Sequence, residues 1–571
     1  MTCGPVGGIP LEPPRGRADI ATSVAGSAAY QISWRRATLS TTTLAIHIRG
    51  KTALPGPPAG STLGAMSYAK ALAVGLVGLA GHVVEVEADL AAGLPGLTLT
   101  GLPDAALSEA RDRVRAALVN SGETWPVRRI TVNLLPAALP KHGSVFDLAI
   151  ACTVLAGAGM LPLAPLGGVV LLGELGLDGT VRPVRGVLPG VLAAVRAGIT
   201  HAVVPVANAR EAALVPGVKV RATDSLRRLI DFIRGSGPLL DVPAVPPPDP
   251  ATGPDLADVV GQDLGRRGLE LAAAGGHHLL MVGPPGAGKT MLARRLPSVL
   301  PPLSDAAALE VTAVHSIAGA LPPDAPMVRR PPFQAPHHTA SVAALIGGGS
   351  GLARPGSISL AHLGVLFLDE APEYSARALE TLRQPLESGE VVLSRTHGTT
   401  RYPARIQLVL AANRCPCAKP SGDVECECTP LVRRRYLGRL SGPLLDRVDI
   451  QVDLLPVTAA QLLHDTGHGE PSAAVAERVA KARSAATARW AAHGWQTNAE
   501  VPGPVLRRHP WRLTRSSTVE LVRYVERGVL SARGYDRVLR IAWTIADLDG
   551  RSRPDAGDVT EALSMRMGRT A

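Results

Sequence analysis

The segment Gly-Pro-Pro-Gly-Ala-Gly-Lys-Thr constrains this 571-residue chain more than any other feature. It follows the apolar run Leu279–Val282 and precedes a helix-compatible stretch from Met291. Strand, glycine-rich turn and helix in this order are typical of a P-loop, whose backbone N–H groups surround phosphates at a helix N-terminus. In this pattern the lysine reaches the β- and γ-phosphates of ATP, and the threonine hydroxyl is a ligand of Mg²⁺. The predicted nucleotide-binding residues are Gly283, Pro284, Pro285, Gly286, Ala287, Gly288, Lys289 and Thr290.

Two further apolar runs end in polar residues that suit the same chemistry. Val365–Leu368 is followed by Asp369 and Glu370. In a P-loop protein we expect Asp369 to hold Mg²⁺ and Glu370 to orient and polarise the attacking water. The strand-like run 406–412 is followed by Asn413, which is placed to hydrogen-bond the water or the γ-phosphate, the sensor 1 role. A turn-forming asparagine after a strand is the structural alternative for Asn413.

Composition limits the class of protein and its partners. The net charge of +11 suits a polyanionic partner such as nucleic acid, but an arginine-rich solvated surface would give the same charge. No N-terminal stretch resembles a signal peptide. The uncharged run Leu148–Gly173 contains prolines and glycines, so it predicts a buried helix, a turn and a buried strand rather than a membrane span. We therefore expect a cytoplasmic protein with no membrane partner.

Changes in composition and in apolar periodicity along the chain predict several domains. The α/β region contains a strand starting at Val83–Val86, a helix over 104–120 and an alternating strand around Ile130–Leu134. Mainly helical patterns, over 473–492, 517–526 and 534–548, dominate the C-terminal part. The expected division is a poorly ordered extension (1–65), an α/β domain (66–236), a proline-rich linker (237–255), a second α/β domain (256–455) and a helical domain (456–571).

Four of the six cysteines are clustered in a C-x-C-x₈-C-x-C pattern, formed by Cys415, Cys417, Cys426 and Cys428. Four thiolates can hold Zn²⁺ in a closed tetrahedral site, which would be structural rather than catalytic. The C-x-C spacing is tighter than the usual C-x₂₋₄-C, and four reduced thiols are the alternative.

The order and context of five segments resemble the ComM/YifB family of magnesium-chelatase-like AAA+ ATPases. These segments are the P-loop, Ala335–Thr339, Leu366–Glu370, Leu440–Arg447 and Ser531–Arg533. The resemblance extends from Met66 to nearly the end of the chain. It implies an α/β fold: a P-loop AAA+ doubly wound parallel sheet with a C-terminal helical lid, preceded by a Lon-protease-like α/β domain.

The resemblance also implies roles for residues outside the P-loop. Arg447 would be an arginine finger that acts in trans on the ATP of a neighbouring subunit in a ring, expected to be a homo-hexamer. A surface ion pair with Asp446 or Asp449 is the alternative for Arg447. Arg533 would be the sensor 2 residue, expected to act in cis, with Arg540 on the same helix as the alternative.

Leu386–Tyr402 is predicted to form a hairpin with its tip near Thr396–Gly398. Related ATPases carry a pore hairpin at this place, so Arg395, His397 and Arg401 would face DNA phosphates in the ring channel. A solvated hairpin is the alternative.

Residues Pro140–Ser144 resemble the active-site loop of Lon proteases. The nucleophile of true Lon proteases falls one residue later, where this chain has Val145. We therefore interpret Ser144 as structural and predict no proteolysis.

The expected function is that of an ATP-hydrolysing ring motor on DNA, with ATP, Mg²⁺ and Zn²⁺ as candidate cofactors. The resemblance implies helicase or branch-migration activity on recombining strands, as in the uptake of transforming DNA. A chelatase-like or protein-remodelling ATPase with a protein partner is the alternative.

Overall fold

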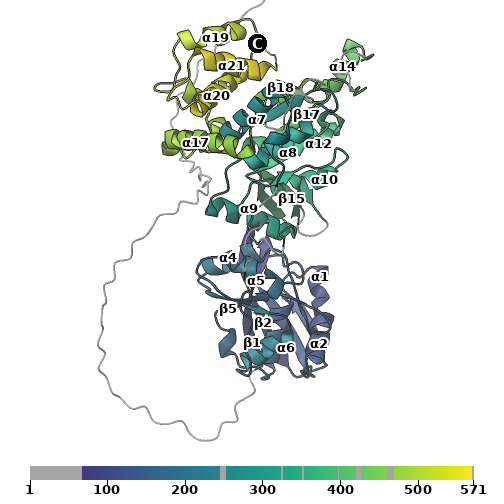
Figure 1. Ribbon diagram of the computed structural model, residues 1–571. Coiled ribbons are helices and arrows are strands. Elements are labelled where there is room, and N and C mark those ends of the chain that lie inside the picture. Colours follow the sequence, from purple (N-terminus) through teal and green to yellow (C-terminus); the bar gives the residue numbers. More distant parts are fainter. Residues whose placement is uncertain are drawn as a thin grey trace, which may run out of the picture. The chain divides into compact units, whose positions relative to one another are not determined.

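Figure 1 shows the computed structural model of the chain. The structure describes residues 67–244, 253–322, 326–349, 353–395, 398–419, 426–458 and 469–568. Contacts between Cα atoms divide the chain into Met1–Thr62 and Leu63–Ala571, so every described residue belongs to the second unit. The predicted extension 1–65 and the centre of the predicted linker lie outside the described residues, and the proposed domain boundaries stay predictions.

The first α/β region is organised by a mixed sheet. Its strands are β1 (Tyr68–Val77), β2 (Ala80–Ala91), β3 (Gly96–Thr100), β4 (Arg129–Leu135), β5 (Val169–Leu171), β8 (His201–Pro205) and β9 (Lys219–Thr223). They lie in the order β3-β4-β2-β1-β5-β8-β9. β2 pairs antiparallel with both β1 and β4, whereas the remaining neighbours are parallel. A short hairpin of β6 (Glu174–Leu175) and β7 (Val181–Arg182) lies outside this sheet.

The first region also contains helices, of which the sequence predicts only those over 104–120 and at the start of the run 148–173. They are α1 (Ala105–Ser108), α2 (Ala110–Asn120), α3 (Asp147–Gly157), α4 (Val187–Arg196), α5 (Val206–Ala212) and α6 (Leu226–Ile233). The predicted helix 104–120 is interrupted by a turn at Glu109, and its predicted apolar face is buried. The alternation in β4 is also confirmed, because Ile130, Val132 and Leu134 are fully buried.

The uncharged run 148–173 folds as the sequence predicts. All residues of α3 are buried, and the run continues through a turn into β5, where Val170 and Leu171 are buried. Among the described residues, no helix combines the length and the hydropathy that crossing a membrane requires. The run therefore supplies the core of the first region.

The second α/β region contains the parallel sheet that carries the nucleotide motifs. Its strands are β10 (Leu279–Val282), β11 (Phe333–Gln334), β14 (Val365–Leu368), β17 (Gln407–Ala412) and β18 (Ile450–Asp453). They lie in the order β11-β14-β17-β10-β18, and every neighbouring pair is parallel. Parallel sheets of this kind are buried on both faces, which explains the continuous apolar runs in the sequence.

Alternate residues of these strands enter two different hydrophobic clusters, one on each face. Met281 and Phe367 belong to the cluster that also contains α7 (Asp263–Gly275) and α8 (Lys289–Val299). Leu280 and Leu366 belong to the other, together with residues of α10 (Val342–Ile346) and α12 (Ala376–Glu380). The remaining helices of this region are α9 (Asp305–Ala318), α11 (Ser357–Leu360), α13 (Arg383–Ser388), α14 (Pro430–Leu437) and α15 (Gly442–Leu445). The doubly wound arrangement is therefore confirmed.

Two short antiparallel pairs accompany the parallel sheet: β12 (Gly347–Gly348) with β13 (Arg354–Pro355), and β15 (Glu390–Arg395) with β16 (Gly398–Pro403). The second pair is the predicted hairpin, but its beginning differs from the prediction. Leu386–Ser388 belong to α13, which ends at Gly389 with a left-handed φ of +70°. A glycine in this conformation is a common helix end, so the strand starts four residues later than expected.

The C-terminal region is helical, as predicted. Its helices are α17 (Ser472–Trp490), α18 (Gly503–Leu506), α19 (Val519–Glu526), α20 (Ala532–Leu548) and α21 (Ala556–Met567). Trp490 is fully buried, and its ring lies 4.6 Å from that of Trp511 and 6.1 Å from that of Trp543. Residues of α17 and α20 share one hydrophobic cluster with the parallel sheet, so the helical region is anchored on the sheet by burial of apolar area.

Candidate functional site

The nucleotide motifs lie at one edge of the parallel sheet because three strands end there in register. β10 pairs with β17 up to Val282↔Ala412, and β17 pairs with β14 up to Leu410↔Leu368. The residues that follow these strands are the P-loop, Asp369 with Glu370, and Asn413. Ligands bind outside the carboxyl ends of parallel strands in open α/β sheets. The structure thus brings together the residues that the sequence singles out for nucleotide chemistry.

Backbone conformation explains the glycines of the P-loop. Gly286 and Gly288 adopt φ angles of +77° and +87°, which favour glycine. Gly283 is needed for a different reason, because a Cβ atom there would lie 2.7 Å from the carbonyl oxygen of Leu454. The loop leads directly into α8, whose first N–H groups and helix dipole favour an anion at this end.

Lys289 is buried at the centre of this edge. Its Nζ donates to the carbonyl oxygens of Gly283 and Pro284 at 2.8 Å each, and to Oδ1 of Asn413 at 3.0 Å. Burial lowers the pKa of this ammonium, while the nearby carboxylates of Asp369 and Glu370 act to raise it. The side chain that is expected to contact phosphate is therefore in direct contact with the candidate sensor.

The two acidic residues after β14 have different surroundings. Oγ1 of Thr290 donates to Oδ2 of Asp369 at 2.6 Å, so the two candidate Mg²⁺ ligands are adjacent. Glu370 has a left-handed φ of +49° and an exposed carboxylate. This backbone conformation, uncommon for a residue with a Cβ atom, turns Glu370 away from the strand direction.

His338 also belongs to this edge, although the sequence analysis gives it no role. Its Nδ1 lies 3.4 Å from Oε2 of Glu370. The loop that carries it follows β11, and the hydroxyl of Tyr374 donates to the carbonyl oxygen of Pro336 in that loop. The only sequence signal was its place in the family segment Ala335–Thr339, because β11 is too short for a strand pattern.

Arg447 lies at the opposite, amino edge of the same sheet. β18 is parallel to β10, and their first residues, Ile450 and Leu279, lie opposite each other. Residues just before Ile450, which include Arg447, therefore lie at the amino ends of these strands. The N–H groups of Asp449 and Ile450 both donate to the carbonyl oxygen of His278, just before β10. Four-residue strands span about 13 Å, which separates Arg447 from the P-loop of its own chain.

The side chain of Arg447 is 13 % exposed, and three other arginines act on its charge. It forms an ion pair with Glu387 and donates to the carbonyl oxygen of Pro443 at 2.5 Å. Burial lowers its pKa, and the positive charges of Arg383, Arg533 and Arg537 lower it further. Among the described residues, its buried Nε has no hydrogen-bond partner. Such a cluster of guanidinium groups favours an anion.

Arg533 lies at this amino edge as well. Its Nη1 is 3.9 Å from Oδ2 of Asp446, and the side chain is 75 % exposed. This placement does not support the expectation that Arg533 acts in cis, because the P-loop of the same chain is at the carboxyl edge. The alternative, Arg540, is largely buried, and its Nε donates to the carbonyl oxygen of Val501 at 2.7 Å.

A buried carboxylate fixes α20 to this edge. Asp449 is 2 % exposed and accepts from Arg537 of α20, and it lies 3.3 Å from Nδ1 of His277. Burial would raise the pKa of Asp449, but Arg537 and His277 hold it well below its ordinary value. Nε2 of His277 lies 2.8 Å from Oγ1 of Thr544, also on α20. Breaking a buried pair of this kind by removing one partner costs about 3–5 kcal/mol.

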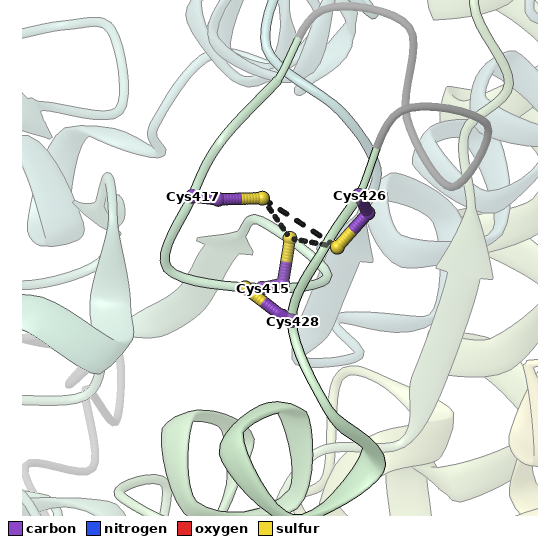
Figure 2. Close-up of side chains that lie close together, drawn as sticks. All are labelled: Cys415, Cys417, Cys426 and Cys428. Carbon is purple, nitrogen blue, oxygen red and sulfur yellow. Dashed lines mark hydrogen bonds between the residues drawn. The ribbon is translucent and has the colours of Figure 1, made fainter.

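The four clustered cysteines converge, as Figure 2 shows. Their Sγ atoms all lie within 4.8 Å of one another, and those of Cys415 and Cys417 are 3.0 Å apart. Four sulfurs at about 2.3 Å from a common centre would be about 3.8 Å apart in a tetrahedron. No disulfide joins the described cysteines. The cluster is therefore compatible with zinc.

The hairpin residues proposed to contact DNA are only partly described. Arg401 in β16 is 64 % exposed and pairs with Glu390 across the hairpin at 2.5 Å. His397 and the side chain of Arg395 lie outside the described residues. A nucleic-acid contact at these three positions stays a prediction.

The polar groups of the Lon-like loop in the first region are hydrogen-bonded. The hydroxyl of Ser144 donates to Glu174, and Nδ1 of His142 lies 3.3 Å from Oδ2 of Asp104. The backbone N–H of Gly143 donates to the same carboxylate. These bonds hold the loop 142–144 against Asp104 and Glu174, and the structural interpretation of Ser144 stays a prediction.

Family models match most of the chain. Residues 255–462 match the model described as magnesium chelatase, subunit ChlI. Residues 86–208 match subunit ChlI of Mg-chelatase, and residues 469–566 match the C-terminal part of subunit ChlI.

Relatives match over nearly their whole length. An uncharacterized protein of Mycobacterium tuberculosis is 54% identical over 501 residues, which is 88% of this chain and 99% of the relative. YifB of Escherichia coli is 42% identical, over 85% of this chain and 94% of the relative. Competence protein ComM of Haemophilus influenzae is 39% identical, over 88% of this chain and 98% of the relative. The chain belongs to the ComM/YifB family of magnesium-chelatase-like AAA+ proteins.

The ComM/YifB assignment agrees with the architecture. A Lon protease of Salinispora arenicola is 31% identical over 145 residues, which is 24% of this chain and 18% of the protease. This local similarity supports the Lon-like part of the predicted fold. Membership of a chelatase-like AAA+ ATPase family implies a nucleotide and Mg²⁺ as cofactors, and Lys289, Thr290 and Asp369 fit this pair by their types and contacts.

Proposed function

We propose that this chain is the subunit of an ATP-hydrolysing ring that acts as a motor on DNA. The observation that carries the ATPase proposal is the convergence of Lys289, Thr290, Asp369, Glu370 and Asn413 at one sheet edge. Hydrogen bonds to carbonyl, amide and hydroxyl groups already hold four of these side chains, those of Lys289, Thr290, Asp369 and Asn413, in place. Preorganised groups of this kind supply most of the catalysis in phosphoryl transfer.

Within one subunit, each side chain has a distinct task. Lys289 would exchange its neutral oxygen partners for phosphate oxygens, and Thr290 and Asp369 would hold Mg²⁺. When bound, Mg²⁺ would supply neutralisation of the charge that develops on the phosphates. Glu370 accepts a proton from the attacking water, and His338 positions its carboxylate. Asn413 orients the water or the γ-phosphate.

Completion of the site requires a neighbouring subunit. Arg447 and Arg533 lie at the edge opposite to the P-loop of their own chain. We therefore assign both of them to the nucleotide of the neighbour. A closed ring gives every P-loop such a partner, and a homo-hexamer is the proposed assembly. An arginine supplied in this way stabilises the transition state and raises turnover by orders of magnitude.

DNA is the proposed substrate of the ring. Similarity to competence protein ComM, a net charge of +11 and an arginine-bearing hairpin support it. Helicase or branch-migration activity on recombining strands is the proposed outcome. The alternative, a chelatase-like or protein-remodelling ring, predicts no effect of DNA on turnover.

The cysteine cluster is proposed to hold one structural Zn²⁺. It follows Asn413 directly and precedes Arg447 in the chain. Four sulfur ligands leave no open coordination position, so the ion would stabilise the fold of this segment without entering the reaction.

Replacing Glu370 by glutamine should leave ATP binding intact but slow hydrolysis by about 10²-fold or more, because the water loses its general base. Steady-state turnover and nucleotide affinity measure the two effects. Glu373→Gln is the matched control, since Glu373 is three residues away and pairs with Arg439 instead. Near-wild-type turnover of Glu370→Gln would disprove the assignment.

Subunit mixing tests the trans role of both arginines. Arg447→Ala and Arg533→Ala subunits should each regain turnover when mixed with Glu370→Gln subunits, because an intact acid then meets intact arginines across one interface. Lys289→Ala mixed with Glu370→Gln should not recover, since both changes damage the same half of the site. Failure of Arg533→Ala to recover while Arg447→Ala does would return Arg533 to a cis role.

Purification without chelators should yield about one zinc per chain by elemental analysis, because four sulfurs complete its shell. Cys417→Ser and Cys428→Ser should lose the metal. Cys152→Ser is the control, because Cys152 is buried within α3 of the first region. A zinc content near zero, with four titratable thiols, would contradict the proposal.

The wild-type ATPase should be stimulated by single-stranded or forked DNA. Arg395→Ala combined with Arg401→Ala should reduce this stimulation but leave basal turnover unchanged. The log–log salt slope of DNA binding should also fall by about 0.7–0.9 for each lost phosphate contact. Arg221→Ala, which removes an exposed arginine of β9 paired with Asp241, is the control. If DNA neither binds to the wild-type protein nor stimulates its ATPase turnover, the result would favour the protein-partner alternative.

A further inference from the structure

Helix α14, labelled in Figure 1, contains three arginines that the nucleotide site does not use. Its eight residues contain three consecutive arginines and no acidic residue. Leu431, Arg434 and Arg435 share one face of the helix, because residues three and four apart are neighbours on a helix surface. The two arginines are exposed, and Leu431 is 61% exposed.

The opposite face of α14 is anchored to the protein. Tyr436 is buried, and the side chain of Arg433 hydrogen-bonds to Cys426 of the cysteine cluster. Arg439, just beyond the helix, donates to the carbonyl oxygen of Pro372 at 3.2 Å and to Glu373 at 3.0 Å. The helix is thus attached to the cysteine cluster at one end and to the segment after Glu370 at the other.

Among the residues that the structure describes, no ion pair neutralises the charges on this exposed face. In the described ranges, the side chains of Arg434 and Arg435 form no ion pair and no hydrogen bond. Glu427, the nearest acidic residue before the helix, pairs with Lys419 at 3.2 Å. Most exposed arginines gain little from such pairs, but two adjacent guanidinium groups without an ion-pair partner among the described residues create a local positive potential.

Helix α19 shows that this composition is not general for surface helices of the chain. It is also exposed, with Val522 at 38% exposure, and it carries Arg523 with Arg527 at its end. However, Glu520 and Glu526 of the same helix balance these charges. Unlike α19, α14 therefore contains no acidic residue that offsets its three arginines.

We infer that the exposed face of α14 binds the phosphate backbone of DNA, an inference that rests on the proposed DNA motor function. Guanidinium groups of Arg434 and Arg435 can each donate to a phosphate. Leu431 lies beside them and offers an apolar contact to the sugars. Because the helix is anchored on its other face, little conformational entropy is lost when DNA binds.

The test compares the wild type with Arg434→Ala/Arg435→Ala. Binding of a fluorescent single-stranded oligonucleotide is measured at two salt concentrations, and the mass of the assembly is measured by sedimentation. Two lost phosphate contacts should reduce the log–log salt slope by about 1.4 and weaken binding roughly 25-fold at 0.1 M salt. Basal ATPase and assembly mass should stay unchanged. Arg523→Ala/Arg527→Ala, which removes the same charge from α19, should behave like the wild type.

The outcomes separate this inference from the proposed function. Wild-type protein that does not bind the oligonucleotide would disprove the DNA motor itself. DNA binding by the wild type with the same affinity and slope in the α14 variant would overturn the α14 assignment alone. A smaller assembly mass in the variant would also overturn it, and would instead identify this face as an interface between copies of the chain. Equal losses in the α14 and α19 variants would show a general effect of charge and no specific surface.

Discussion

Parallel register between β10, β14 and β17 is the constraint on which the nucleotide site depends. Because these strands end together, residues more than a hundred positions apart in the chain become neighbours, and Nζ of Lys289 reaches Asn413 at 3.0 Å. Alternate residues of the same strands pack into hydrophobic clusters on both faces of the sheet, and this packing keeps the edge rigid. A site for phosphoryl transfer depends on positioning, so this rigidity is the main contribution of the fold.

The opposite edge of the sheet depends on a single buried carboxylate. Asp449 accepts from Arg537 of α20 and lies next to His277 before β10. Through these bonds the helical region is held where Arg533 and Arg447 lie close to one another. One sheet therefore has a carboxyl edge that suits a nucleotide and an amino edge that suits an anion from outside the chain. Such a two-sided subunit is suited to head-to-tail assembly into a ring.

The cysteine cluster and α14 belong to one continuous segment of the chain. This segment begins after Asn413 at the nucleotide edge and continues through the four cysteines and the basic helix to Arg439. Arg439 pairs with Glu373, which lies three residues after the candidate catalytic acid Glu370. The proposed sensor, metal site and DNA contact are therefore connected within a short stretch of chain. A contact at α14 is consequently close, along the chain, to the residues proposed to sense and hydrolyse ATP.

Local patterns in the sequence predicted the candidate nucleotide-binding residues and the strands that precede them. Short apolar runs ending in a glycine-rich loop, in Asp369 or in Asn413 predict strands and their catalytic ends, because these signals need only neighbouring residues. Alternation in β4 and the four-cysteine spacing are local in the same sense. The predicted start of the hairpin was wrong, because Leu386–Ser388 belong to a helix that ends at Gly389 and that the apolar pattern does not show. Only the tertiary structure placed His338 beside Glu370 and Arg533 beside Asp446. These contacts join distant segments, and their existence depends on strand order and helix packing, which no local pattern encodes.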